Sequence, residues 1–155
     1  EPARYDPLNY LDDAALRQKT GSLPWPQQCA AAEIIAGNLK VHICYLVHAG
    51  PARQIPLRPN SPEAIPVLNN VSPEALAGQL KGAPAISLDF DGAKIRLPLP
   101  KRAAEITAQI DGERSLAKIR RRLGKSGGKM SAGVFARQFG ELYKALNGIN
   151  AMLLR

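Results

Sequence analysis

The chain of 155 residues is poor in cysteine, in aromatic side chains and in long apolar segments. It has two cysteines, Cys29 and Cys44, and nothing else indicates an oxidising compartment, so free thiols and a cytoplasmic location are expected. The longest apolar stretch near the start, residues 29–36, is interrupted by Glu33 and is far too short to span a bilayer. Residues 1–4 lack the pattern of a signal peptide. No membrane association is therefore expected, and the missing initiator Met suggests a piece of a longer polypeptide.

Recognisable catalytic and metal-binding motifs are also lacking. Residues 124–126 resemble the end of a phosphate-binding loop, but Ile119 stands where the loop needs its first glycine. His42, Cys44 and His48 share one face of a predicted strand and would suit zinc, but a fourth ligand is missing. No Ser, Cys or carboxylate is spaced to act as a nucleophile or orienting partner for a histidine. The sequence therefore predicts no catalytic, cofactor-binding or metal-binding residue in this chain.

The chain does have an unevenly distributed positive charge. Its formal net charge is +8, and residues 101–155 hold 12 of the 21 Lys and Arg residues but only 4 of the 13 Asp and Glu residues. The first 100 residues are balanced at 9 of each kind. Because the field near a surface follows the local charge, the last third of the chain is expected to face a polyanion or an acidic protein surface. Two bodies with different tasks are predicted.

The first body, residues 1–50, is predicted to be a helix and strand extension. Helical spacing of apolar residues predicts a short helix within residues 6–21 and a second one from Pro26 to Gly37. Strict alternation over residues 40–47 predicts a strand. Residues 51–66 are rich in proline and are predicted to be a linker.

The second body, residues 67–155, is predicted to be a winged-helix-like domain in a chain of the α+β class. Ser72 and Pro73 mark a helix start, and two alternating segments around Asp91 and Gly92 predict a hairpin. Three helices follow: one over residues 101–110, one that packs Leu116, Ile119 and Leu123, and a long one that packs Phe135, Phe139, Leu142 and Leu146. A final strand over residues 149–154 is expected to join the hairpin.

Basic residues cluster on the middle helix of this domain, on the side opposite its apolar residues. The candidate partner-binding residues are Lys118, Arg120, Arg121, Arg122, Lys125 and, on the following helix, Arg137. In a helix-turn-helix the following helix would read bases, yet its outward residues are a mixed set. The cluster would contact phosphate groups rather than bases if it bound nucleic acid. A protein-docking or solvated basic face is the favoured hypothesis, and a winged-helix nucleic-acid-binding module is the alternative.

Several short sequence segments in the first third of the chain resemble the region that follows the catalytic core in a family of bacterial class I S-adenosylmethionine-dependent methyltransferases. The phrases are residues 1–7, 10–11, 23–24 and 32–38, followed by His42. More loosely, the phrase over residues 110–116 makes the second half similar to the winged-helix domain that closes some bacterial protein-lysine methyltransferases. The glycine-rich turn and acidic residue of their cofactor site are absent in this sequence.

This resemblance implies a non-catalytic C-terminal region of a methyltransferase that serves substrate or partner recognition or regulation. S-adenosylmethionine is expected as the cofactor of the parent protein and not of this chain. The implied partners are the catalytic domain of the same polypeptide and a protein substrate or second subunit.

Overall fold

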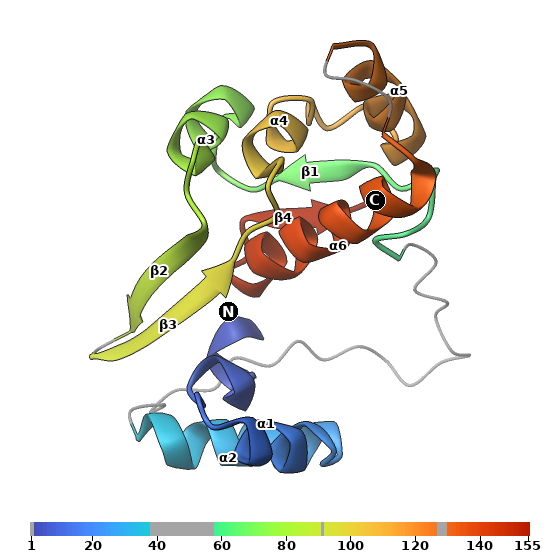
Figure 1. Ribbon diagram of the computed structural model, residues 1–155. Helices are drawn as coiled ribbons and strands as arrows, with labels where there is room; N and C mark the ends of the chain where they lie inside the picture. The colour runs from blue at the N-terminus through green and yellow to red at the C-terminus, as the bar shows by residue number, and fades with distance from the viewer. Residues whose placement is uncertain (1, 38–57, 91, 127–129) are drawn as a thin grey trace, which may run out of the picture. The chain divides into compact units, whose positions relative to one another are not determined.

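The computed structural model describes residues 2–37, 58–90, 92–126 and 130–155 (Figure 1). Helices and short strands are mixed, so the predicted α+β class is confirmed. The chain divides into two compact units. Unit 1 contains Glu1–Ala3, Leu57–Ser87 and Arg96–Arg155, and unit 2 contains Arg4–Pro56 and Leu88–Ile95.

Within unit 2 the described N-terminal residues form short helices. The predicted helix over residues 6–21 is interrupted: a 3-10 turn, η2 (Pro7–Asn9), precedes α1 (Ala14–Gly21). The helix predicted from Pro26 is confirmed as α2 (Trp25–Ala36), which ends at Gly37 in the left-handed conformation, with φ of 68°. A further 3-10 turn, η1 (Pro2–Tyr5), precedes them, and its first two residues belong to unit 1. The strand predicted over residues 40–47, with His42, Cys44 and His48, lies outside the described residues.

Two separate two-stranded sheets are present among the described residues. The predicted hairpin is confirmed as β2 (Ala85–Phe90) paired with β3 (Ala93–Pro98). The final strand, β4 (Met152–Leu154), pairs antiparallel with β1 (Pro66–Leu68). The prediction that the last strand joins the hairpin is therefore wrong. The three residues of β1 begin at a proline after a proline-rich stretch, so no alternating pattern marks them as a strand.

Residues 58–66, which were predicted to end the linker, belong to unit 1. Ala64 is fully buried, and its carbonyl oxygen accepts a hydrogen bond from the Leu116 amide at 2.9 Å. The amides of Ile65 and Arg155 each donate to the other's carbonyl oxygen, at 2.8 and 3.0 Å, which extends the β1–β4 pairing. Residues 58–66 therefore pack within unit 1. The rest of the predicted linker, residues 51–57, lies outside the described residues.

Four helices enclose the core of unit 1. They are α3 (Pro73–Leu80), α4 (Ala103–Thr107), α5 (Leu116–Ser126) and α6 (Ala132–Gly148). The predicted cap of α3 is confirmed, since the Ser72 hydroxyl accepts a hydrogen bond from the Ala75 amide at 3.1 Å. In Figure 1, α3, α4 and α5 follow one another along β1, and α6 packs on α4 and β4. The apolar positions predicted for α6 are all buried: Phe135, Phe139, Leu142 and Leu146.

Candidate partner-binding site

A tight turn between α4 and α5 fixes the start of α5. One oxygen of the Asp111 carboxylate accepts hydrogen bonds from the amides of Glu113, at 3.0 Å, and Arg114, at 2.8 Å. The other oxygen forms an ion pair with Nε of Arg114 at 3.1 Å. Gly112 has a φ of 76°, a conformation that glycine adopts without steric cost. The turn therefore holds the Arg114 side chain in one place.

The charge of Asp111 is stabilised by this turn. Partial desolvation raises the pKa of its carboxyl, but hydrogen bonds from the backbone amides of Arg114 and Glu113 and the charge of the Arg114 guanidinium outweigh this effect and lower the pKa below its ordinary value of 3.8. Asp111 is therefore ionised at neutral pH. Arg114 also donates from Nη1 to the Gln109 carbonyl oxygen at 3.2 Å, which leaves Nη2 as the nitrogen without a partner among the described residues.

The helix that follows has one apolar side and one basic side. Leu116, Ile119 and Leu123 are buried, as their spacing predicted. On the other side, Lys118, Arg121 and Arg122 are exposed, whereas Arg120 is half-buried. Lys125 belongs to α5, but its side chain lies outside the described part of the structure. Among its described side chains, the predicted basic face of α5 thus has three exposed members, Lys118, Arg121 and Arg122.

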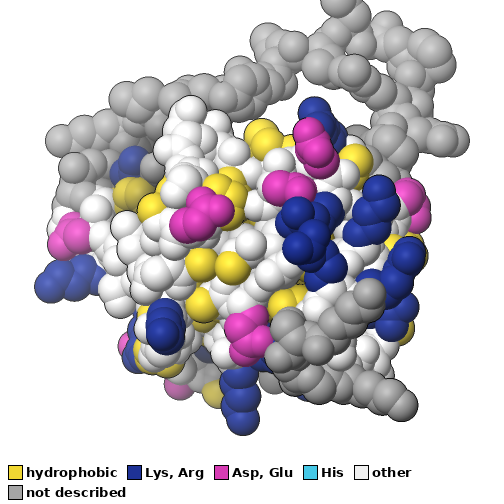
Figure 2. All heavy atoms as spheres, turned by 90° about the horizontal axis from the view of Figure 1, so that it is seen from above, with side chains coloured by type: hydrophobic (Ala, Val, Ile, Leu, Met, Phe, Trp, Pro, Cys, Tyr) yellow, Lys and Arg dark blue, Asp and Glu magenta, His cyan; other side chains and the backbone are white. Residues whose placement is uncertain are grey.

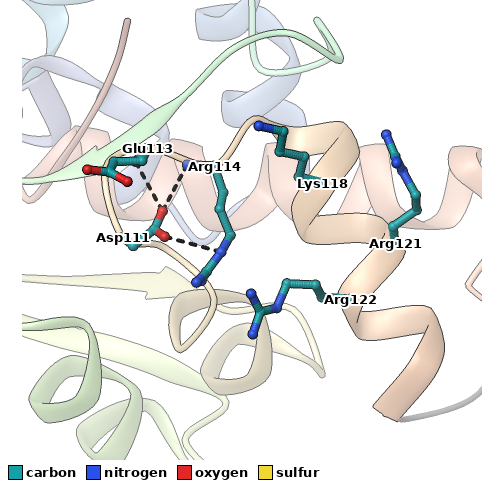
Figure 3. A pocket seen from close by; sticks show the side chains of 6 residues that line it. All are labelled: Asp111, Glu113, Arg114, Lys118, Arg121 and Arg122. Atoms are coloured by element: carbon teal, nitrogen blue, oxygen red, sulfur yellow. Dashed lines mark hydrogen bonds and ion pairs between the residues drawn. The ribbon is translucent and has the colours of Figure 1, made fainter.

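These three side chains line a hollow of about 450 Å³ together with Asp111, Glu113 and Arg114; we call it the α5 hollow (Figure 3). Arg114 was not singled out from the sequence; it precedes α5, whereas Lys118, Arg121 and Arg122 recur at i, i+3 and i+4 on that helix. We call these four residues the basic row. In Figure 3, Arg122 extends from α5 in the direction of Arg114, whereas Arg121 leaves the helix in a different direction.

The α5 hollow carries an excess of positive charge. Its lining has four basic and two acidic side chains, which gives a formal charge of +2. Lys118 and Arg121 have no hydrogen-bond or ion-pair partner among the residues that the structure describes. Figure 2 shows Lys and Arg side chains gathered on part of one face, with acidic side chains beside them. The hollow can therefore attract an anion.

The remaining predicted site residue, Arg137, is exposed on α6 and does not line the α5 hollow. Along α6 the other exposed charges are Glu141 and Lys144, so this helix has mixed charge on its outer side. The Gln138 side-chain oxygen accepts a hydrogen bond from the Arg102 amide at 3.3 Å, which engages an amide side chain that could otherwise read adenine. The geometry therefore separates Arg137 from the basic row.

A second hollow of about 750 Å³ lies between the end of α3 and the start of α4. Apolar residues form much of its lining, including Ala77, Leu80, Leu99 and Ala104, and Lys81, Lys101 and Glu105 also border it. The Glu105 carboxylate is engaged by Arg102, whose Nε donates to it at 2.8 Å. The lining of this hollow is therefore largely apolar, in contrast to the basic lining of the α5 hollow.

Cys29 is the free cysteine among the described residues, and its thiol is not activated. Burial, followed by the charge of Glu33, raises the pKa of the half-buried Cys29 thiol, so this thiol stays protonated at neutral pH and is a poor nucleophile. In the described ranges no group of three or more His, Cys, Asp or Glu side chains could hold a metal ion. Every described helix is too short or too polar to cross a membrane.

Comparisons of the chain with models of protein families, with curated proteins and with solved structures found no match.

Proposed function

We propose that unit 1 is a winged-helix-like module that docks an acidic protein surface through the basic row, and that the chain is the non-catalytic C-terminal region of a bacterial S-adenosylmethionine-dependent methyltransferase. The observation that carries the docking function is the exposed charge of Lys118, Arg121 and Arg122 opposite the buried side of α5. Exposed cations change the stability of the fold little, and they gain binding free energy when they pair with carboxylates or phosphates of a partner.

The winged-helix part of the proposal is supported by the order of elements in unit 1. Three helices, α4, α5 and α6, are followed by a strand that pairs within the unit. The methyltransferase part is supported by the phrases of the N-terminal third and by residues 110–116, which form the turn at the α5 hollow. In this arrangement the module would bind a protein substrate, a second subunit or the catalytic domain of its own polypeptide.

A nucleic-acid-binding function is the second candidate, because the basic row could also contact phosphates of a duplex. Base reading would then fall to α6, the last of the three helices. The outer side of α6 carries Arg137, Glu141 and Lys144, and a carboxylate there opposes the phosphate backbone. Mixed charge on the reading helix therefore favours a protein partner.

Binding to two labelled probes distinguishes these functions. The probes are a fluorescein-labelled peptide of alternating Glu and Leu and a labelled duplex of about 20 base pairs, measured by anisotropy from about 50 to about 200 mM salt. At the higher salt we expect the chain to bind the peptide more tightly than the duplex, because a protein that contacts phosphates loses several orders of magnitude in duplex affinity over this range of salt.

Charge reversal then identifies the surface. The variant Lys118→Glu, Arg121→Glu, Arg122→Glu should lose peptide binding, whereas Arg137→Glu, which changes one exposed cation on α6, should retain it. Tight, salt-sensitive duplex binding that the triple variant abolishes would replace docking by nucleic-acid recognition. Peptide binding that survives the triple variant would show that the basic row is not the docking surface.

The methyltransferase part is tested by calorimetry. This chain should not bind S-adenosylmethionine, whereas the polypeptide encoded by the complete reading frame should bind it. Micromolar binding of the cofactor by this chain would contradict the proposal.

A further inference from the structure

The chemistry of the α5 hollow indicates which anion it takes. Its formal charge of +2 comes from the six side chains that line this one hollow. Within the hollow, Asp111 already neutralises Arg114, so the excess is carried by the side chains of α5. A single bound group with two negative charges would balance that excess.

The first amides of α5 are not available to such an anion. The Leu116 amide donates to the Ala64 carbonyl oxygen and the Ala117 amide to the Pro62 carbonyl oxygen, both at 2.9 Å. An anion in the hollow is therefore held by side chains. Three of the four basic side chains are arginines, whose planar guanidinium groups present paired N–H donors that fit the oxygens of a phosphate group.

The turn prepares one of these arginines. Nε of Arg114 is engaged by Asp111 at 3.1 Å and Nη1 by the Gln109 carbonyl oxygen at 3.2 Å, so the guanidinium plane is fixed before any ligand arrives. Nη2 remains to donate to a ligand, and Lys118, four residues further on, adds a cation without a partner among the described residues. Fixing a donor in advance reduces the entropy that binding would otherwise cost.

We infer that the α5 hollow binds a phosphate monoester, carried as a phosphorylated side chain on the protein partner that the basic row docks. This inference rests on the proposed docking function and names the chemistry of the partner. A monoester carries about two negative charges at neutral pH, since its second pKa is about 6, and it offers three acceptor oxygens. A phosphodiester carries one charge for each phosphate, and a Glu side chain likewise carries one.

The test compares labelled peptides that differ at one position. The peptides have the same neutral sequence with phosphoserine, glutamate or serine at the centre, and a labelled oligothymidine of similar length supplies phosphodiesters. Anisotropy at about pH 7.5 should give an affinity for the phosphoserine peptide at least about tenfold above that for the glutamate peptide, with the oligothymidine also weaker. Lowering the pH to about 5 should remove most of that preference, because the phosphate then carries about one charge.

Two variants test whether the phosphate binds in the α5 hollow. Lys118→Gln combined with Arg122→Gln should weaken binding of the phosphoserine peptide by about tenfold, and Arg137→Gln on α6 should change it by less than about twofold. Far-UV circular dichroism and thermal midpoints equal to those of the unmodified chain would show that the variants are folded.

The outcomes separate this inference from the docking function. Equal affinity for the phosphoserine and glutamate peptides, together with binding of the acidic Glu and Leu peptide, would overturn the phosphate assignment and leave docking in place. Failure of every peptide to bind would overturn both. Stronger binding of oligothymidine than of the phosphoserine peptide would assign the hollow to nucleic acid instead.

Discussion

Replacing Ile119 by alanine should reveal how much the packed side of α5 stabilises unit 1. The side chain of Ile119 is 0% exposed, and the substitution removes three carbon groups. At about 0.8 kcal/mol for each buried carbon group the transfer cost is about 2.4 kcal/mol. The remaining cavity adds to this cost, and the higher helix propensity of alanine offsets a few tenths of a kcal/mol, so the expected loss is about 3 kcal/mol.

Urea unfolding followed by circular dichroism at the helical band measures this loss. With a slope of about 1.5 kcal/mol per molar urea, a loss of about 3 kcal/mol moves the midpoint by about 2 M. Ile119→Val should cost only about 1 kcal/mol, because it removes one carbon group. The exposed Arg121, substituted by glutamate, should change the unfolding free energy by less than about 0.5 kcal/mol.

The reasoning would be refuted if Ile119→Ala and Arg121→Glu shifted the midpoint equally, or if Ile119→Ala shifted it by less than about 0.5 M. Either result would mean that α5 does not place Ile119 inside and Arg121 outside, and the basic row would lose its structural basis.

Three further results are expected. Thr107 is 0% exposed and its hydroxyl has no partner among the described residues, so Thr107→Val should stabilise the chain by about 1 kcal/mol while Thr107→Ser destabilises it, as thermal unfolding would show. The pKa of Asp111 is lowered from 3.8 in the folded chain, so its carboxylate stabilises the fold above that pH. The difference in unfolding free energy between wild type and Asp111→Asn should therefore be constant near neutral pH. It should shrink as the pH falls through the pKa of the folded chain. A fragment of residues 58–155 should unfold cooperatively in urea. A fragment of residues 67–155 should be markedly less stable, because it lacks the buried Ala64 and its hydrogen bond. Equal stability of the two fragments would support a boundary at Val67.

The sequence predicts the helices of unit 1 well where a helix has a periodic apolar side or a capping residue close to it in the chain. Ser72 caps α3, and Phe135, Phe139, Leu142 and Leu146 repeat at helical spacing on α6. Such signals depend on neighbours within a few residues. They are therefore visible without knowledge of the tertiary structure.

The strand pairing and the α5 hollow could not be predicted in the same way, because both depend on residues that are distant in sequence or on side chains of a turn. β1 pairs with a strand more than eighty residues away, and its start at Pro66 looks like part of the preceding loop. Arg114 precedes α5, and its contacts with Asp111 and with the Gln109 carbonyl oxygen place it at the hollow that Lys118 also lines. Asp111, three residues before Arg114, was the signal in the sequence that could have indicated an ion pair at this turn.

The most direct test of the docking surface is a map of backbone amide shifts in a ¹⁵N-labelled sample titrated with the acidic Glu and Leu peptide. We expect the largest shifts at residues 111–122, the turn and basic side that form the α5 hollow, and small shifts along α6. Largest shifts on α6 around Arg137, or at the apolar hollow between α3 and α4, would contradict the assignment of the docking surface to the basic row.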